Sequence, residues 1–232
     1  MTGSAVHPVA MYLPAHFAES RPEVLQQLVL EHPFGLLVTQ DANGVIANSV
    51  PFFLDADPAG GPGVLRAHVA RASPVWREAR TDVDSLVVFQ GAQTYVSPAW
   101  YPSKAEHGKV VPTWNYIMVQ GRGAVRFIDD RAWLHAFVTR LTDAHEAGRV
   151  ARAPGAAAAP WAVSDAPADY VETMLRAIVG VEIVLSSLVG KWKVSQNRSA
   201  ADRAGVARGL GEVAGDEAAA MAREVGASGP AT

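Results

Sequence analysis

The sequence contains no cysteine among its 232 residues. This absence excludes disulfides, zinc sites built on thiolates and thiol nucleophiles, and it is typical of a protein from a reducing compartment. No Lys or Arg precedes Arg21, so the cationic start of a signal peptide is missing, and no uncharged apolar run reaches the ~18 residues of a membrane helix. We therefore expect a cytoplasmic protein that does not enter a membrane.

Positive charge is also scarce. The chain has 20 Lys and Arg against 23 Asp and Glu, a net charge of -3, whereas proteins that bind the phosphate backbone are usually basic. It contains no helix-turn-helix signature, no P-loop and no Gly-x-Gly-x-x-Gly after a strand. Direct DNA binding therefore has no support from the sequence.

The remaining pattern is one of strands in hairpins with short helices between them. Residues 34–40 and 45–53 are rich in β-formers and flank Asn43-Gly44, a pair that supplies the positive φ of a tight turn. Further strands are predicted at 63–70, 86–89, 94–97, 110–128 and 179–189, and helices at about 20–32, 73–80, 130–141 and 169–178. This order predicts the α+β class, with an antiparallel β-barrel and short peripheral helices.

We expect a single domain over residues 11–210. Residues 148–165 are rich in Ala and Pro, which is typical of a mobile connector, and carry one aromatic residue, Trp161. Residues 211–232 contain good helix formers with little apolar periodicity and are predicted to be a flexible tail.

A first candidate cluster follows the last strand, in the sequence GKWKVSQNRS at 190–199. Alternation along a strand places Lys191, Lys193 and Ser195 on one face, and two ammonium groups so close repel unless they reach water or share an anion. A solvated strand end is the commoner explanation of a lone Lys-x-Lys, and the polar residues that follow, among them Gln196, raise the alternative of an anion site.

A second cluster lies at the junction between a strand and a helix, in the sequence RAHVARASPVW at 66–76. The Arg71 guanidinium, the Ser73 hydroxyl and the first N–H groups of the helix suit a phosphate. Many junctions carry an arginine and a capping serine for structural reasons alone. Alternation places His68 and Arg71 on opposite faces, so both reach one ligand only if the strand ends near Ala70.

A third cluster interleaves aromatic residues with proline and polar side chains, in YVSPAWYPSK at 95–104 and VPTWNY at 111–116. Such a mixture can clamp a planar ligand by stacking, with Thr113 and Asn115 as directional hydrogen-bonding groups beside Trp114 and Tyr116. An aromatic core or a dimer interface explains the same composition equally well. The other histidines are scattered and receive no role.

Together the three clusters resemble one family. HVARASPVW, YVSPAWYPSK, VVPTWNY and GKWKVSQNR occur in the order and spacing of the PaiB-type proteins, described as FMN-binding negative transcriptional regulators, and MYLPAHF at 11–17 and HPFGLLVT at 32–39 match as well. The resemblance implies an FMN-binding split β-barrel that forms a homodimer with its cofactor sites at the subunit interface. Ser73 stands where relatives commonly have asparagine.

The resemblance also implies roles for individual residues. Arg71 and Ser73, with His68 beside them, become candidates for the FMN phosphate. Residues 48–52 of the second hairpin strand, among them Asn48, Ser49, Val50 and Pro51, would line the isoalloxazine. The other implied contacts come from the barrel wall and the polar rim: Thr113, Trp114, Asn115, Tyr116, Lys191, Lys193, Ser195 and Gln196.

Function stays open between classes at this point. The resemblance favours a flavin-linked sensor that regulates transcription indirectly, whereas a flavin-dependent oxidoreductase is the enzymatic alternative. The haem-dependent piperazate synthases, which form an N–N bond, share a His-x-x-Arg-x-x-Pro pattern. In that case the cofactor would be haem b and His68 its axial ligand.

Overall fold

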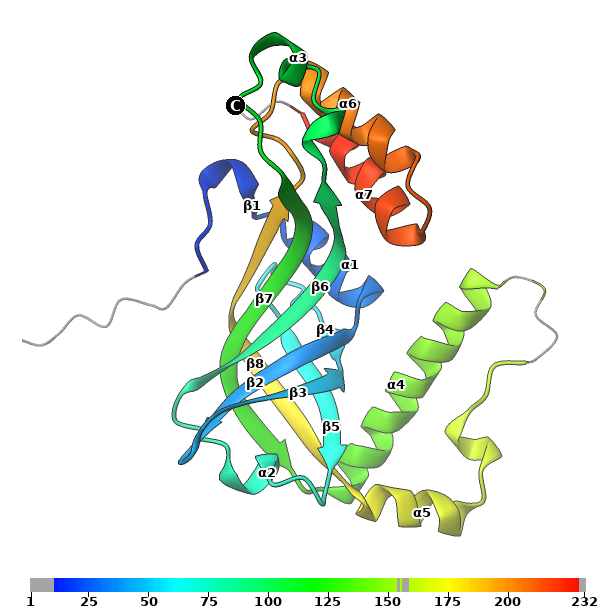
Figure 1. The fold of residues 1–232 in the computed structure, drawn as a ribbon. Helices are drawn as coiled ribbons and strands as arrows, with labels where there is room; N and C mark the ends of the chain where they lie inside the picture. The colour runs from blue at the N-terminus through cyan, green and yellow to red at the C-terminus, as the bar shows by residue number, and fades with distance from the viewer. Residues whose placement is uncertain (1–10, 154, 156–158, 230–232) are drawn as a thin grey trace, which may run out of the picture. The chain divides into compact units, whose positions relative to one another are not determined.

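The computed structural model describes residues 11–153, 155 and 159–229. They divide into two compact units. In its described part, unit 1 contains residues 11–20, 91–118 and 190–229, and unit 2 contains residues 21–90 and 119–189 apart from the gaps. Three long strands contribute to both units (Figure 1): β6 (Asp84–Val96), β7 (Thr113–Ile128) and β8 (Ile178–Lys193).

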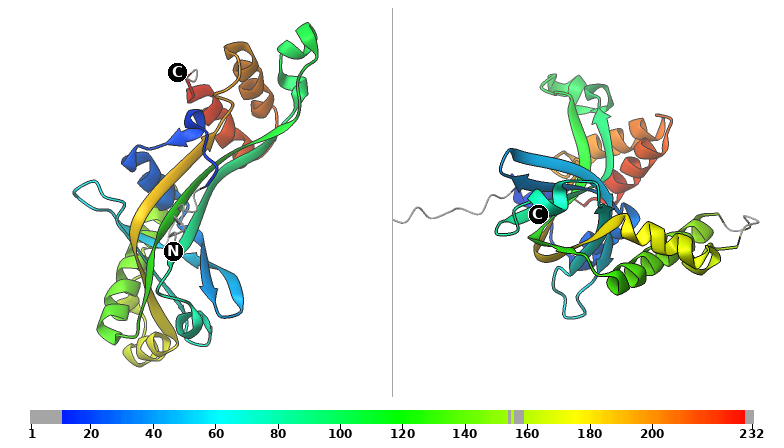
Figure 2. Two further views of the ribbon diagram at one scale, coloured as in Figure 1. Left: turned by 90° about the vertical axis from the view of Figure 1, so that its left-hand side faces the viewer. Right: turned by 90° about the horizontal axis from the view of Figure 1, so that it is seen from below.

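The sheet is antiparallel in every pairing whose register is known, with the strand order β3-β2-β6-β7-β8-β5-β4. Within unit 2 its other strands are β2 (Phe34–Asp41), β3 (Gly44–Pro51), β4 (Phe53–Asp55) and β5 (Val64–Ala70). β2 and β3 form the predicted hairpin, visible in Figure 2, and its turn places Gly44 at φ 137°, which glycine adopts readily. One continuous strand, β6, replaces the two strands predicted at 86–89 and 94–97.

The core of unit 2 is formed by the inward-facing residues of these strands, which alternate with exposed ones. Leu37, Leu65, Val87 and Ile183 are fully buried. The helices of unit 2 are α1 (Pro22–Glu31), α2 (Val75–Glu78), α4 (Arg131–Arg152) and α5 (Ala168–Arg176), with a 3-10 turn, η3, at Val163–Asp165.

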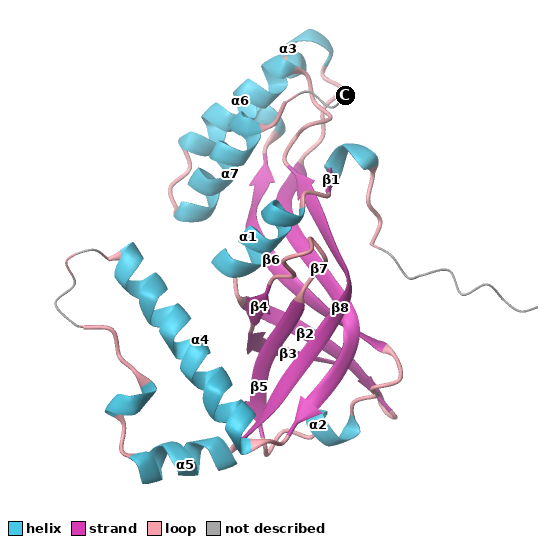
Figure 3. Ribbon diagram, turned by 180° about the vertical axis from the view of Figure 1, so that it is seen from behind, coloured by secondary structure: helices cyan, strands magenta, loops and turns pink. Residues whose placement is uncertain are grey.

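α4 lies along the outer face of β5 and β8 (Figure 3). Asp130 caps it by accepting a hydrogen bond from the Trp133 N–H at 2.7 Å, and it buries Leu134, Phe137 and Leu141 as its apolar stripe predicts. A Cβ at Gly180 of β8 would lie 2.3 Å from the Trp133 ring, so glycine permits this close contact. α4 ends at Arg152, inside the segment predicted to be a connector.

Unit 1 contains η1 (Ala15–Phe17), β1 (Ala18–Glu19), η2 (Pro98–Trp100), α3 (Ser103–His107), α6 (Ala200–Gly211) and α7 (Asp216–Ala227). β1 pairs with β8 at Lys191 and Gly190. α6 and α7 pack side by side, as Figure 2 shows. Where the sequence predicts a flexible tail after residue 210, α7 buries Ala218, Met221 and Val225.

None of the helices in the described part of the chain is long and apolar enough to cross a membrane.

Candidate functional site

The residues that sequence analysis assigns to one site fall into two groups, one in each compact unit. Thr113 to Tyr116, Lys191, Lys193, Ser195 and Gln196 belong to unit 1, and Ser49 to Pro51, His68, Arg71 and Ser73 belong to unit 2.

The two lysines of unit 1 flank one aromatic ring. Both ammonium groups lie over the ring of Tyr116, Lys191 Nζ at 5.4 Å and Lys193 Nζ at 5.9 Å from its centroid. Lys191 is only 6% exposed, and its ammonium donates to the backbone carbonyl of Tyr12 at 2.8 Å. Lys193 donates to Thr113 Oγ1 at 2.7 Å and to the Trp114 carbonyl.

Lys191 is buried and Lys193 half-buried, and both lack a counter-charge in the described part of the chain. In the described part of the chain neither forms an ion pair with a carboxylate, because their acceptors are carbonyl and hydroxyl oxygens. Burial lowers the pKa of Lys193 below its ordinary value, and the positive charges of Arg198 and Lys191 lower it further. A buried cation usually has a charged partner, so this arrangement suits an anion supplied by a ligand.

The turn after the lysines has an unusual backbone. Ser195 has φ 68°, a left-handed conformation that non-glycine residues seldom adopt. The Asn115 side chain holds it by donating from Nδ2 to Ser195 Oγ at 3.0 Å, and both residues are buried. Backbone strain of this kind is concentrated at functional sites. Here the strained residue lies two positions after Lys193, in the turn that follows the lysines.

Gln196 has a structural role in the same turn. Its Oε1 accepts from the Val194 N–H at 2.8 Å and its Nε2 donates to the Trp192 carbonyl at 2.5 Å. Because each end of the amide makes a hydrogen bond within the turn, Gln196 stabilises the turn.

The aromatic residues of unit 1 include an exposed pair. Trp114 is 56% exposed and Tyr95 46% exposed, and their rings meet edge to face with centroids 6.2 Å apart. Tyr101, by contrast, is buried beneath the Arg198 guanidinium, which lies 4.9 Å from its ring. Burial raises the pKa of Tyr101, and its hydroxyl has no partner among the described residues.

In unit 2, β5 ends at Ala70, as the joint use of His68 and Arg71 requires. The Arg71 guanidinium nevertheless already has several partners. It forms a bidentate pair with Asp129, at 2.8 Å and 2.5 Å, and donates to the carbonyls of Arg176 and Ile178. The hydrogen bonds from Arg71 hold the pKa of Asp129 below its usual range. Arg71 thus ties the end of β5 to the segments before α4 and β8.

Ser73 and His68 have fewer contacts. Ser73 Oγ accepts from the Val75 N–H at 3.4 Å, near the limit of a hydrogen bond. His68 faces α4, where its ring lies 6.2 Å from that of Phe137. Its Nδ1 is buried and has no hydrogen-bond partner among the described residues, and burial lowers its pKa.

The strand predicted to line the isoalloxazine has two faces. Ser49 and Pro51 lie opposite Leu36 and Phe34 on the outer face of the hairpin, whereas Val50 is 4% exposed and faces the core. Asn48 shares the inner face, and its Nδ2 is buried without a partner among the described residues.

Two further residues emerge from these contacts: Tyr12 and Arg198. The MYLPAHF and SQNR motifs contain them, so the signals were present. Sequence spacing alone could not show that Tyr12 supplies the acceptor for Lys191, which is 179 residues away.

Comparison with known proteins identifies the family of this chain. The family model described as "Putative FMN-binding domain" matches residues 11–187. An uncharacterized protein of Emericella nidulans is 35% identical over 93% of this chain and 98% of its own length. Protease synthase and sporulation protein PAI 2 of Bacillus subtilis is 29% identical, over 83% of this chain and 85% of its own length.

Among solved structures, the flavocytochrome Anf3 from Azotobacter vinelandii matches with a TM-score of 0.52 at 13% identity, over 76% of this chain and 69% of that chain. The predicted α+β fold, an antiparallel FMN-binding split barrel, is confirmed, and so is the PaiB-type resemblance. The chain belongs to the family of FMN-binding split-barrel proteins that the "Putative FMN-binding domain" model defines.

Proposed function

We propose that this protein binds FMN and acts as a flavin-linked sensor of the PaiB type. The observation that carries the proposal is the lysine pair of unit 1, which lies over the Tyr116 ring with Lys191 buried and Lys193 half-buried, without an ion pair in the described part of the chain. The FMN phosphate and the electron-rich pyrimidine end of a reduced flavin are groups that such cations stabilise. Bound FMN would supply the electron transfer.

The protein's own groups have separable tasks in this proposal. Lys191 and Lys193 would neutralise an anionic group, and the exposed rings of Trp114 and Tyr95 would offer a stacking surface. The Asn115–Ser195 pair would keep the lysines in place. Arg71, Ser73 and His68 stay candidates for the phosphate, although a phosphate would have to compete with Asp129 for Arg71.

An absorption spectrum of the purified protein tests the proposal, with mass analysis of the small molecule released on denaturation. Flavin bands and released FMN support it, and reduction of those bands by NAD(P)H would add a flavin-dependent oxidoreductase activity. A protein that neither retains FMN nor binds it on reconstitution would contradict the proposal.

We further propose that the protein is a homodimer through the outer face of β3, β2 and β6. On this face Phe34 and Leu36 are 68% and 40% exposed, and the register places Ser49 and Val88 on either side of Leu36. Val45, 72% exposed, extends the apolar surface. An apolar patch on a sheet marks an interaction surface, and two equal copies can cover each other's patch.

Light scattering during gel filtration measures the oligomeric state directly. The wild-type chain should elute with the mass of two copies, and Phe34→Glu together with Leu36→Glu should give one copy with an unchanged far-ultraviolet CD spectrum. A wild-type monomer at micromolar concentration would remove the homodimer from the proposal.

A haem-binding function is the second candidate, because His68 has a buried Nδ1 without a partner in the described part of the chain. A solved structure with the same fold is a flavocytochrome. A Soret band that disappears in His68→Ala while flavin binding persists would establish haem b as a ligand of His68. The absence of a Soret band after reconstitution with haem would exclude this candidate.

A further inference from the structure

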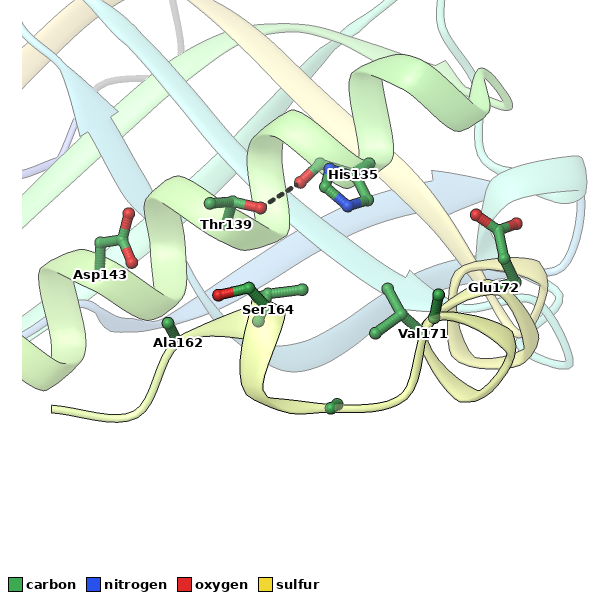
Figure 4. A pocket seen from close by; sticks show the side chains of 10 residues that line it. His135, Thr139, Asp143, Ala162, Ser164, Val171 and Glu172 are labelled. Atoms are coloured by element: carbon green, nitrogen blue, oxygen red, sulfur yellow. Dashed lines mark hydrogen bonds between the residues drawn. The ribbon is translucent and has the colours of Figure 1, made fainter.

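A pocket of about 560 Å³ lies in unit 2, away from the residues discussed above. It is formed by one face of α4 on one side and by η3 and the start of α5 on the other (Figure 4). A second hollow adjoins it and shares His135 and Glu172 with it. Neither the PaiB-type motifs nor the proposed flavin site includes this pocket.

The wall contributed by α4 is a row of polar side chains spaced four residues apart. His135, Thr139 and Asp143 therefore lie on one face of the helix, as Figure 4 shows. Asp143 lies eight positions after His135, which is about 12 Å along the helix axis. The Thr139 hydroxyl donates to the His135 carbonyl at 2.8 Å, so this proton is already used.

A carboxylate stands at each end of the row. Glu172 lies at the His135 end, where Arg131 pairs with its Oε1. Its Oε2 is buried and has no hydrogen-bond partner among the described residues. At the other end Asp143 forms neither an ion pair nor a side-chain hydrogen bond within the described part of the chain. Each end thus has a carboxylate oxygen without a donor among the described residues, exposed in Asp143 and enclosed by neighbouring atoms in Glu172.

The surface between the two carboxylates is mainly apolar. It consists of the methyl and isopropyl groups of Ala162, Val163, Ala166, Ala168 and Val171, and it includes one hydroxyl, that of Ser164. An anionic ligand would be repelled by the carboxylates, and a flat aromatic ligand would find no aromatic ring other than the His135 imidazole. A chain of methylene groups matches such a surface, and an ammonium group matches each end.

We propose that this pocket binds a linear aliphatic α,ω-diamine. One ammonium group binds Asp143, the other binds Oε2 of Glu172, and the methylene chain lies on the alanine and valine side chains. Arg131 occupies the opposite oxygen of Glu172 and is 67% exposed, so water screens its charge from the bound ammonium. The separation of the carboxylates makes chain length the determinant of affinity.

Isothermal titration of the full chain with a homologous series of α,ω-diamines, from short to long, tests this proposal. We expect saturable binding at physiological salt with one molecule per chain and an optimum at an intermediate chain length. The diol of that optimal length should not bind. A wild-type chain that binds no diamine, or binds all lengths equally, overturns the proposal.

Paired variants separate a specific site from general attraction to an acidic protein. Asp143→Asn with Glu172→Gln removes both ligating charges and should weaken binding at least about tenfold. Glu78→Gln with Glu106→Gln removes the same charge from exposed positions outside the pocket and should leave affinity unchanged. Equal losses in the two pairs would show non-specific attraction and overturn the proposal.

A third variant tests the pocket even if the substitutions at Asp143 and Glu172 disturb folding. Ala166→Leu keeps every charge but fills the apolar middle of the pocket, so it should weaken binding while the melting temperature stays close to that of the wild type. FMN binding by all variants reports the flavin site independently, since none of the substituted residues belongs to it. If Ala166→Leu binds diamine as well as the wild type does, the ligand does not occupy this pocket.

Discussion

In the sequence, two cationic clusters suggest an anion site, and the structure contains one of them in each unit. The two clusters differ in the partners of their positive charges. Arg71 of unit 2 has a bidentate carboxylate partner in Asp129 and two carbonyl acceptors. Lys191 and Lys193 of unit 1 have only carbonyl and hydroxyl acceptors. A charge that is already paired stabilises the fold, whereas a buried charge without a counter-ion is available for a ligand.

The sharpest test of this comparison removes both lysine charges while retaining their bulk. Lys191→Met with Lys193→Met should raise the Kd for FMN about 100-fold or more, because each charged hydrogen bond is worth about 1.5–3 kcal/mol. Fluorescence titration of FMN measures the change. Lys104→Met with Lys109→Met alters the same net charge at exposed positions and should leave the Kd unchanged. If both pairs behave alike, the lysines do not contact the cofactor.

Breaking the pair in unit 2 should have a smaller effect on FMN and a visible effect on stability. Arg71→Ala and Asp129→Asn each remove the same bidentate interaction, so each should lower the Tm by a few degrees. The Tm of the double variant should be no lower than that of the less stable single variant. Thermal unfolding followed by CD provides the measurement.

The same two variants also distinguish the phosphate assignment of Arg71. If Arg71 holds the phosphate, Arg71→Ala weakens FMN binding and Asp129→Asn strengthens it by releasing the guanidinium. If Arg71 is only structural, both variants bind FMN as the wild type does. Opposite shifts in the Kd of the two variants would therefore assign Arg71 to the phosphate.

Local patterns predict much of this fold, and the reason is visible in particular residues. The Asn43-Gly44 turn and the capping residue Asp130 act within a few positions of the chain, so the hairpin and the start of α4 are correctly predicted. α6 and α7 escape prediction because they are rich in alanine and glycine. Small residues bury a helix without a strong apolar stripe, and α6 buries two glycines.

The candidate site is harder to predict because its decisive contacts are not local. Asp129 is 58 residues from Arg71, and Ser195 is 80 residues from Asn115. Sequence analysis identifies residues that could bind an anion, but it cannot tell an arginine that pairs with a carboxylate from a lysine that has no such partner in the described part of the chain. Gln196 shows the same limit, because its polar side chain serves the turn in which it lies.

The smallest expected effect concerns pH and compares Lys193 with an ordinary lysine. Burial and the neighbouring positive charges lower its pKa from 10.5 in the folded chain, so between the two values the unfolded chain holds one proton more. Stability therefore rises with pH through that window. Lys193→Met should remove the contribution of Lys193 to the pH dependence of the free energy of unfolding. The difference between the wild type and the variant separates this contribution from that of the other titrating groups. Bound FMN, by restoring the pKa, should flatten the wild-type slope toward that of the variant, and a slope unaffected by FMN would place the anion elsewhere.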